Sequence, residues 1–273
     1  MIKFILPNGF TNPDNNLGLI EENEYQNLFW GIETEIPFSI FTGRINNNNN
    51  FVGTFLSYDD IVKLSKCYNE ILENMFVFDF GNLFLEEGDY ENCLGDVIFT
   101  EFVNQKNVYF EIADINFIDF LVKKYPQIQI ILHENYTIFY NDQQIQQLID
   151  KYPNNIKAIN ITILHVCEEV NIPKIGILNL DSCYYCPQFP LCLNKENKSV
   201  LRFRKASMFN ECQKKKLINI DTAVKNLSLL LKHTDMILFE TIPLAQQEDY
   251  LNLINLVLKN EEIKEEEKKD EEF

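Results

Sequence analysis

Apolar residues gather in short runs along this chain, and the runs recur at intervals that leave room for a helix between them. Most runs are nearly continuous in apolar residues, which is typical of parallel strands covered on both faces. The eight runs are residues 2–6, 36–41, 75–80, 108–113, 128–133, 157–164, 174–180 and 235–240. Each predicts one strand.

Helix-like stretches fill most of the intervals. Ser57 with Asp60 three residues later is typical of a helix start, and apolar residues from Ile61 to Leu72 then recur on one face. Further helices are predicted to begin near Asp114, Asn141, Asp221 and Ala245. Eight strands alternating with helices predict a (β/α)₈ TIM-like barrel, irregular near the N-terminus. A doubly wound open sheet is the alternative, although no glycine-rich phosphate loop follows the first strand.

The interval between the seventh and eighth strands is too long for an ordinary connection, and it is rich in cysteine. It begins DSCYYCPQFPLC, and the four cysteines it contains are Cys183, Cys186, Cys192 and Cys212. The sequence therefore predicts one barrel domain over residues 1–260 with a metal-binding loop at 181–216. The remaining residues, 261–273, are mostly charged and are predicted to form an acidic disordered tail.

Cysteine chemistry points to a metal in that loop. Seven cysteines, an odd number in a chain of this size, argue for reduced thiols and against a disulfide framework. Four clustered thiolates suit either a [4Fe-4S] cluster or a tetrahedral zinc ion, and their spacing leaves both open. The other three, Cys67, Cys93 and Cys167, are scattered and are predicted to be ordinary buried thiols.

Charge limits the choice of partners. A net charge of −17 disfavours broad electrostatic binding to nucleic acid or to an anionic membrane. One basic island, residues 195–216, overlaps the cysteine loop. The residues predicted to bind an anionic substrate are Arg44, Arg202, Arg204 and Lys205. The predicted partner is therefore a small anionic molecule or a protein, with nucleic acid disfavoured.

Polar residues at the predicted strand ends supply the catalytic candidates, because active sites of (β/α)₈ barrels lie at the carboxyl ends of the strands. The weak candidates are Asp79, His133 and Glu240. His133 and His165 also fit hydrogen-bonded core histidines, and Asp114 also fits a helix cap. No apolar stretch reaches the roughly 18 residues of a membrane span, so we expect a soluble, cytoplasmic protein.

Several segments between residues 75 and 258 resemble the collagenase-like U-family peptidases and their relatives. They include FEIADINFIDFLVKKYPQIQIILHENYTIFYNDQQIQQLIDKYP, GILNLDSCYYCP and ILFETIPLAQQEDYLNLINLVLK. The resemblance implies a TIM-like barrel and, as in several relatives, a [4Fe-4S] cluster held by the four clustered cysteines. Relatives include peptidases and oxygen-independent hydroxylases acting on RNA or on the ubiquinone ring. This chain departs from them in its cysteine spacing and at Glu240–Pro243, where relatives carry a Lys-Ile-Glu-Gly-Arg signature.

The leading hypothesis is an iron-sulfur TIM-barrel protein that acts as an oxygen-independent hydroxylase or another modifying enzyme. Its substrate would be small and anionic, or linked to RNA. One alternative is a non-enzymatic binding or scaffold protein in which zinc stabilises the loop. A peptidase is the third possibility, but no Ser-His-Asp set or zinc-protease motif in the sequence supports proteolysis.

Overall fold

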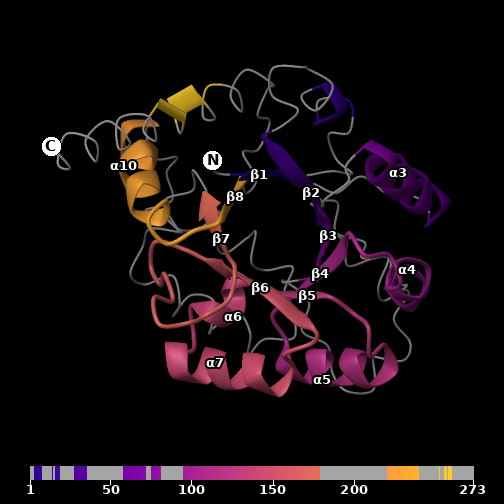
Figure 1. The fold of residues 1–273 in the computed structure, drawn as a ribbon. Coiled ribbons are helices and arrows are strands. Elements are labelled where there is room, and N and C mark those ends of the chain that lie inside the picture. The colour runs from indigo at the N-terminus through magenta and orange to yellow at the C-terminus, as the bar shows by residue number, and fades with distance from the viewer. Residues whose placement is uncertain are drawn as a thin grey trace, which may run out of the picture.

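Eight parallel strands form a closed barrel in the computed structural model of this chain (Figure 1), each paired with its sequence neighbours and the last paired with the first. The structure describes residues 3–7, 14, 16–18, 28–35, 58–71, 75–80, 95–178, 220–239, 252, 255–256 and 258–259. The strands are β1 (Lys3–Leu6), β2 (Phe29–Glu35), β3 (Met75–Asp79), β4 (Val108–Ile112), β5 (Ile130–Leu132), β6 (Ile156–Ile161), β7 (Lys174–Leu178) and β8 (Met236–Phe239). The predicted (β/α)₈ barrel is confirmed, and the open sheet is excluded.

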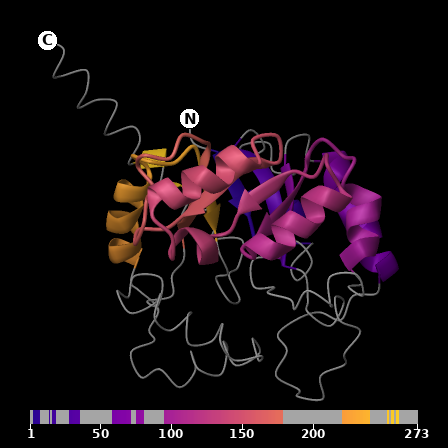
Figure 2. The same ribbon diagram turned by 90° about the horizontal axis from the view of Figure 1, so that it is seen from below.

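Helices form an outer layer around the strands, which Figure 2 shows from a second direction. They are α3 (Tyr58–Ile71), α4 (Gly95–Phe102), α5 (Ile115–Lys124), α6 (Glu134–Thr137), α7 (Asp142–Lys151) and α10 (Ile220–Leu230). Two of the predicted starts are confirmed in detail. The Asp114 carboxylate accepts hydrogen bonds from the first turn of α5, and Asn141 forms a capping box with Gln144 at the start of α7. None of the helices in the described part of the chain is long and apolar enough to cross a membrane.

The second strand is Phe29–Glu35, and the prediction that residues 36–41 form it was wrong. Residues 36–41 lie outside the described residues. Two acidic residues, Glu33 and Glu35, interrupt the apolar pattern of the true strand, so it does not look like a buried strand in the sequence. Glu33 is nevertheless buried. Arg44 consequently stands further along the chain from the end of this strand than the sequence predicted.

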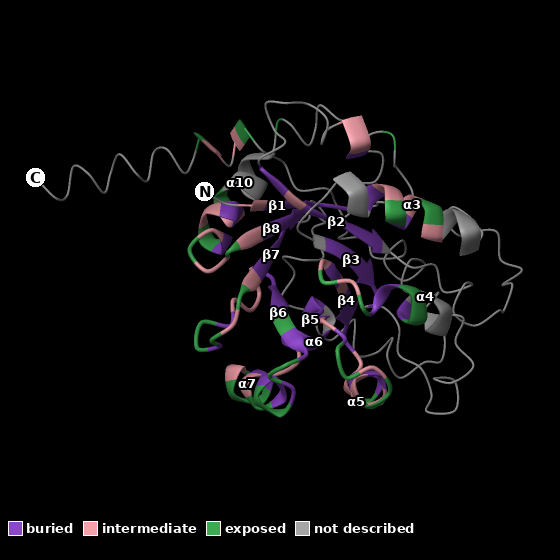
Figure 3. Cartoon of the chain, turned by 45° about the vertical axis from the view of Figure 1, so that its right-hand side comes forward, coloured by how far each residue is buried: buried purple, intermediate pink, exposed green. Residues whose placement is uncertain are grey.

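The apolar side chains of the strands divide into two layers, because successive residues of a strand point to opposite faces. One layer packs between the barrel and its helices and is rich in phenylalanine, including Phe78, Phe99 and Phe110. The other fills the barrel interior and includes Val77, Ile131, Ala158 and Leu238, with Tyr109 packed against it. Figure 3 shows most strand residues as buried, while most exposed residues lie on the helices and the connecting loops.

Val77, Tyr109 and Ile131 lie on three neighbouring strands, and their side chains point into the barrel. Two residues further along each of these strands, towards its carboxyl end, stands an ionisable residue: Asp79, Glu111 and His133. The apolar interior is thus succeeded by a polar layer at the carboxyl end of the barrel, the end at which enzymes of this fold place their active sites.

Candidate active site in the mouth of the barrel

Four polar side chains converge inside the barrel near the carboxyl ends of β3 to β6, and a fifth, Glu33, is buried on the inner face of β2. Strand register shows that these side chains point into the barrel. Asp79 pairs with Glu111, and Glu33 pairs with the inward-facing Val77. The five residues, with their exposed fractions, are Glu33 (7%), Asp79 (9%), Glu111 (2%), His133 (3%) and Asn160 (0%). This concentration of buried ionisable groups is unusual for a barrel interior, where apolar residues normally dominate. We call Asp79, Glu111, His133 and Asn160 the mouth cluster.

His133 lies at the centre of the mouth cluster. Its Nε2 atom is 3.4 Å from Oε1 of Glu111 and 3.8 Å from Oδ1 of Asp79. The backbone fixes this position, because the N–H of His133 donates to the carbonyl oxygen of Ile112 at the end of β4 (3.1 Å). One ring nitrogen therefore faces two carboxylates that come from two different strands.

Glu134 orients the imidazole from the other side. Its Oε2 atom is 3.1 Å from Nδ1 of His133, and both side chains are almost fully buried. This contact fixes the orientation of the ring, with Nδ1 towards Glu134 and Nε2 towards Glu111 and Asp79. Glu134 begins the short helix α6, whose last residue, Thr137, donates its hydroxyl to the carbonyl oxygen of Asn160 (2.8 Å). Helix α6 thus holds both His133 and the β6 member of the cluster in place.

Asn160 completes the mouth cluster from β6. Its Nδ2 atom donates to Oε1 of Glu111 at 2.5 Å. A carboxylate only accepts, so this contact fixes which end of the amide is nitrogen. The oxygen at the other end, Oδ1, is buried and has no hydrogen-bond partner. An orphaned acceptor in a fully buried side chain costs free energy, which makes it a feature that needs a cause.

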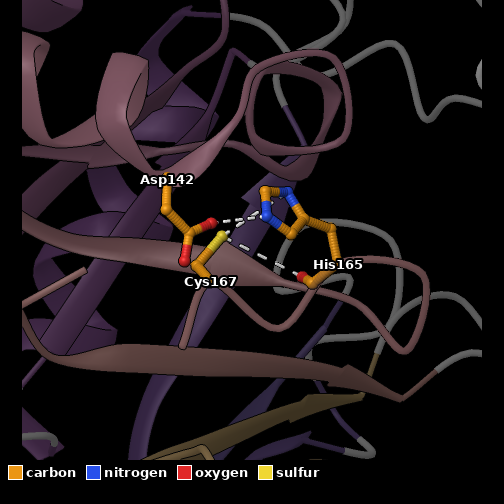
Figure 4. A group of neighbouring side chains, drawn as sticks. All are labelled: Asp142, His165 and Cys167. Carbon is orange, nitrogen blue, oxygen red and sulfur yellow. Dashed lines mark hydrogen bonds and ion pairs between the residues drawn. The ribbon is translucent and has the colours of Figure 1, made fainter. Parts of the chain in front are cut away.

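A second group of ionisable side chains lies on the outer rim of the same barrel end (Figure 4). There Oδ1 of Asp142 is 2.6 Å from Nε2 of His165, and the carbonyl oxygen of Thr137 is 2.6 Å from Nδ1. Both ring nitrogens of His165 therefore contact acceptor oxygens, one on a side chain and one on the backbone. The other oxygen of Asp142 accepts from the backbone N–H of Glu169. This group fastens the segment after β6 onto the start of α7.

Cys167 belongs to this rim group, but it is not a catalytic thiol. Its sulfur is 3.8 Å from Nδ1 of His165, a nitrogen that already donates to Thr137. The residue is fully buried, with a backbone φ of 49°, and burial raises the pKa of its thiol from 9.0 to about 12. The thiolate is the reactive form of cysteine, and the Nδ1 atom nearest the sulfur is already directed at the Thr137 carbonyl, so the contacts of this group favour a structural role. The prediction of a buried thiol is confirmed for Cys167 and wrong for Cys67, which is only partly buried, while Cys93 lies outside the described residues.

We expect iodoacetamide to alkylate Cys167 of the folded protein at pH 8 roughly 1000-fold more slowly than in urea, because the raised pKa leaves almost no thiolate. Peptide mass spectrometry measures the rates, with the half-buried Cys67 as an internal comparison.

The raised pKa of the Cys167 thiol also predicts that the protein loses stability at alkaline pH. Between pH 9 and 12 the unfolded chain loses this proton and the folded chain keeps it, so the free energy of unfolding should fall as pH rises. Fast labelling of Cys167 in the folded state would contradict both expectations.

The structure brings two of the three catalytic candidates together, since Asp79 and His133 both belong to the mouth cluster. Glu240, the third, lies outside the described residues, directly after β8. So do the residues predicted to bind a metal or an anionic substrate: Cys183, Cys186, Cys192, Cys212, Arg44, Arg202, Arg204 and Lys205. The structure therefore leaves these predictions untested.

Sequence reasoning missed Glu33, Glu111 and Asn160. Each sits within a strand and not at its end, so the search for polar residues at strand ends passed over it. A usable signal was present, because an acid or amide in the middle of an apolar run, as in VYFEI and IKAINI, is costly to bury without a partner.

Fold and site together define a (β/α)₈-barrel protein with a buried polar centre in the barrel mouth. No protein-family model matches this chain. A search of curated proteins also finds no match. The resemblance to the U-family peptidases and their relatives consequently remains a prediction from the sequence.

Proposed function

We propose that this protein is an enzyme that modifies a small polar molecule in the mouth of its barrel, with Asp79, Glu111 and His133 acting on the substrate. The observation that carries this proposal is the convergence of these three side chains from three successive strands. Their location is the one at which enzymes of this fold gather their catalytic groups. Carboxylates and imidazoles are also the groups that most often transfer protons or position a reacting group.

The energetic cost of the mouth cluster supports a catalytic role over a structural one. Taking carboxylates out of water costs several kcal/mol each unless charge and hydrogen bonds compensate for it. A layer of apolar side chains would close this barrel at lower cost, as Val77, Ile131 and Ala158 do one layer below. Buried polar groups that are not required for the fold are typical of functional sites.

We further propose that Cys183, Cys186, Cys192 and Cys212 hold a [4Fe-4S] cluster on the same side of the barrel. Chain connectivity supports this location. Strand β7 ends at Leu178, shortly before Cys183, and α10 begins at Ile220, shortly after Cys212. When bound, such a cluster supplies electron transfer. Arg202, Arg204 and Lys205 belong to the same segment of chain and would attract an anionic substrate, as an oxygen-independent hydroxylase or a related modifying enzyme requires.

The test is a turnover screen with protein purified without oxygen. We expect the wild-type protein to contain about four irons per chain and to convert a component of a mixture of small carboxylic acids and other metabolites, measured by mass spectrometry. His133→Gln and Glu111→Gln should each lower turnover by about 10²–10⁴-fold, the usual contribution of a proton-transfer group. Asp119→Asn is the matched control, because Asp119 forms only a surface ion pair with Lys151.

Wild-type turnover in the His133→Gln variant would contradict the catalytic assignment. The proposed [4Fe-4S] cluster is tested separately, by metal analysis. A colourless protein holding one tightly bound zinc, lost in Cys183→Ser, would show that the cysteines stabilise the loop and would favour a scaffold. The His133→Gln and Glu111→Gln variants must retain the wild-type circular dichroism spectrum, which shows that the barrel has folded.

A further inference from the structure

We propose that the mouth cluster is a binding site for one divalent metal ion, with Asp79, Glu111, His133 and Oδ1 of Asn160 as its protein ligands. None of the four clustered cysteines belongs to this proposed ligand set. The inference rests on the proposed function in so far as both place the chemistry in the barrel mouth. The binding of the ion is measurable without any substrate.

The spacing of the acceptor atoms fits a shared ion. One atom each from Asp79, Glu111 and His133 lie within 4.8 Å of one another, and the two distances from Nε2 of His133 are 3.4 and 3.8 Å. Ligands about 2.1 Å from a common ion stand about 3.0–4.2 Å apart, depending on the angle between them. A cation at the centre of the cluster would therefore contact these atoms with only small movements of the side chains.

Glu134 prepares His133 to be a ligand. Oε2 of Glu134 lies 3.1 Å from Nδ1 of the ring, so Nε2, the nitrogen that faces Asp79 and Glu111, is the one that would contact a metal ion. A histidine ligand commonly donates its other N–H to a carboxylate in this way, which fixes the tautomer and makes the ligating nitrogen more basic. One ligand atom each of Asp79, Glu111 and His133 then lies within 4.8 Å of the others, and a cation bound between them would attract all three.

The side chain of Asn160 favours a bound metal ion over an additional proton as the positive charge in the mouth cluster. A second proton on His133 would satisfy Nε2 and the carboxylates, but it would leave Oδ1 of Asn160 without a partner in a fully buried side chain. The amide nitrogen is already committed to Glu111, so the amide cannot turn to place a donor there. A metal ion bound beside Glu111 would supply a partner for this oxygen. Amide oxygens are common ligands of hard cations.

The ligand set indicates the class of ion. Three oxygen donors and one imidazole suit a hard or borderline divalent cation such as Mn²⁺, Fe²⁺ or Zn²⁺, and no soft sulfur atom belongs to the group. The rim group of Asp142, His165 and Cys167 is a weaker competitor, although its ligand atoms also lie within 4.8 Å of one another. Its histidine nitrogens and both oxygens of Asp142 already take part in hydrogen bonds, and its thiol keeps its proton.

Titration with Mn²⁺ tests the proposal. The chain is first stripped with a chelator, and free Mn²⁺ is then followed by electron paramagnetic resonance, with calorimetry as a second readout. We expect one Mn²⁺ per chain with micromolar or tighter affinity, and at least 100-fold weaker binding in Asp79→Asn and in Glu111→Gln. Pulsed measurements should show nitrogen coupling to the bound Mn²⁺ that disappears in His133→Gln, a signature that a purely structural role of His133 would not produce. Asp142→Asn on the rim should bind Mn²⁺ as the wild type does.

Absence of Mn²⁺ binding to the wild-type protein, with Zn²⁺ and Fe²⁺ also failing, would overturn the inference. So would binding that survives in Asp79→Asn and Glu111→Gln but is lost in Asp142→Asn. These outcomes separate the two proposals. If no ion binds yet His133→Gln abolishes turnover, the metal site fails and the proposed function stands. If the ion binds as expected and turnover is unaffected by these variants, the metal site stands and the proposed function fails.

Discussion

Replacing Phe110 with alanine is expected to lower the free energy of unfolding by about 3–5 kcal/mol, the usual cost of removing a fully buried aromatic side chain. Phe110 is fully buried between β4 and the helices, and its ring centroid lies 4.8 Å from that of Phe99 and 5.6 Å from that of Phe78. Removing the ring leaves a cavity bordered by rings that are themselves tightly packed. Offset and edge contacts between aromatic rings add about 0.5–1.5 kcal/mol per pair beyond the area buried.

Urea unfolding followed by the fluorescence of Trp30, the only tryptophan, measures this effect at a site distant in sequence. Phe110→Leu should cost much less, because it keeps most of the volume. Phe120→Ala is the matched control for residue type, since Phe120 lies on α5 and is only partly buried, and its replacement should cost about 1 kcal/mol or less. A loss of similar size at Phe120 would show that the stability of the barrel does not depend on this aromatic layer.

Strand β4 shows why the fold was readable from the sequence while most of the site was not. In VYFEI, Phe110 points to the helices and Glu111 points into the barrel. The fold follows from the local recurrence of such apolar runs, and seven of the eight predicted strands correspond to strands of the barrel. The exception, β2, carries Glu33 on its inner face, and that acid hides the strand from a search for apolar runs.

The site depends on register between strands, which no local pattern contains. Asp79 and Glu111 become neighbours only because β3 and β4 pair with these two residues side by side. His133 joins them because β5 is short and its next residue still points inward. The sequence could propose Asp79 and His133 as separate polar residues at strand ends, but it could not show that they share a centre, nor that Asn160 donates to Glu111.

Asp79→Asn is expected to have different effects on the metal-free protein and on its response to metal. Without metal, the variant should be at least as stable as the wild type, since asparagine keeps the size of the side chain and removes one buried negative charge. With metal, the variant should be less stable than the wild type. A ligand present at 100 times its Kd stabilises the folded state by about 2.7 kcal/mol, and the variant should lose this gain.

Urea unfolding with chelator and with excess Mn²⁺ measures both effects, and Asp119→Asn on the surface of α5 serves as the control that should change neither. The signs of the stability changes with chelator and with Mn²⁺ decide whether Asp79 is a metal ligand. If Asp79 were only the ion-pair partner of a protonated His133, neutralising it would leave a buried charge poorly compensated, and the variant would be less stable in both conditions. If the mouth cluster binds a cation, only the wild type gains stability when Mn²⁺ is added, because Asp79→Asn lacks one of the ligands.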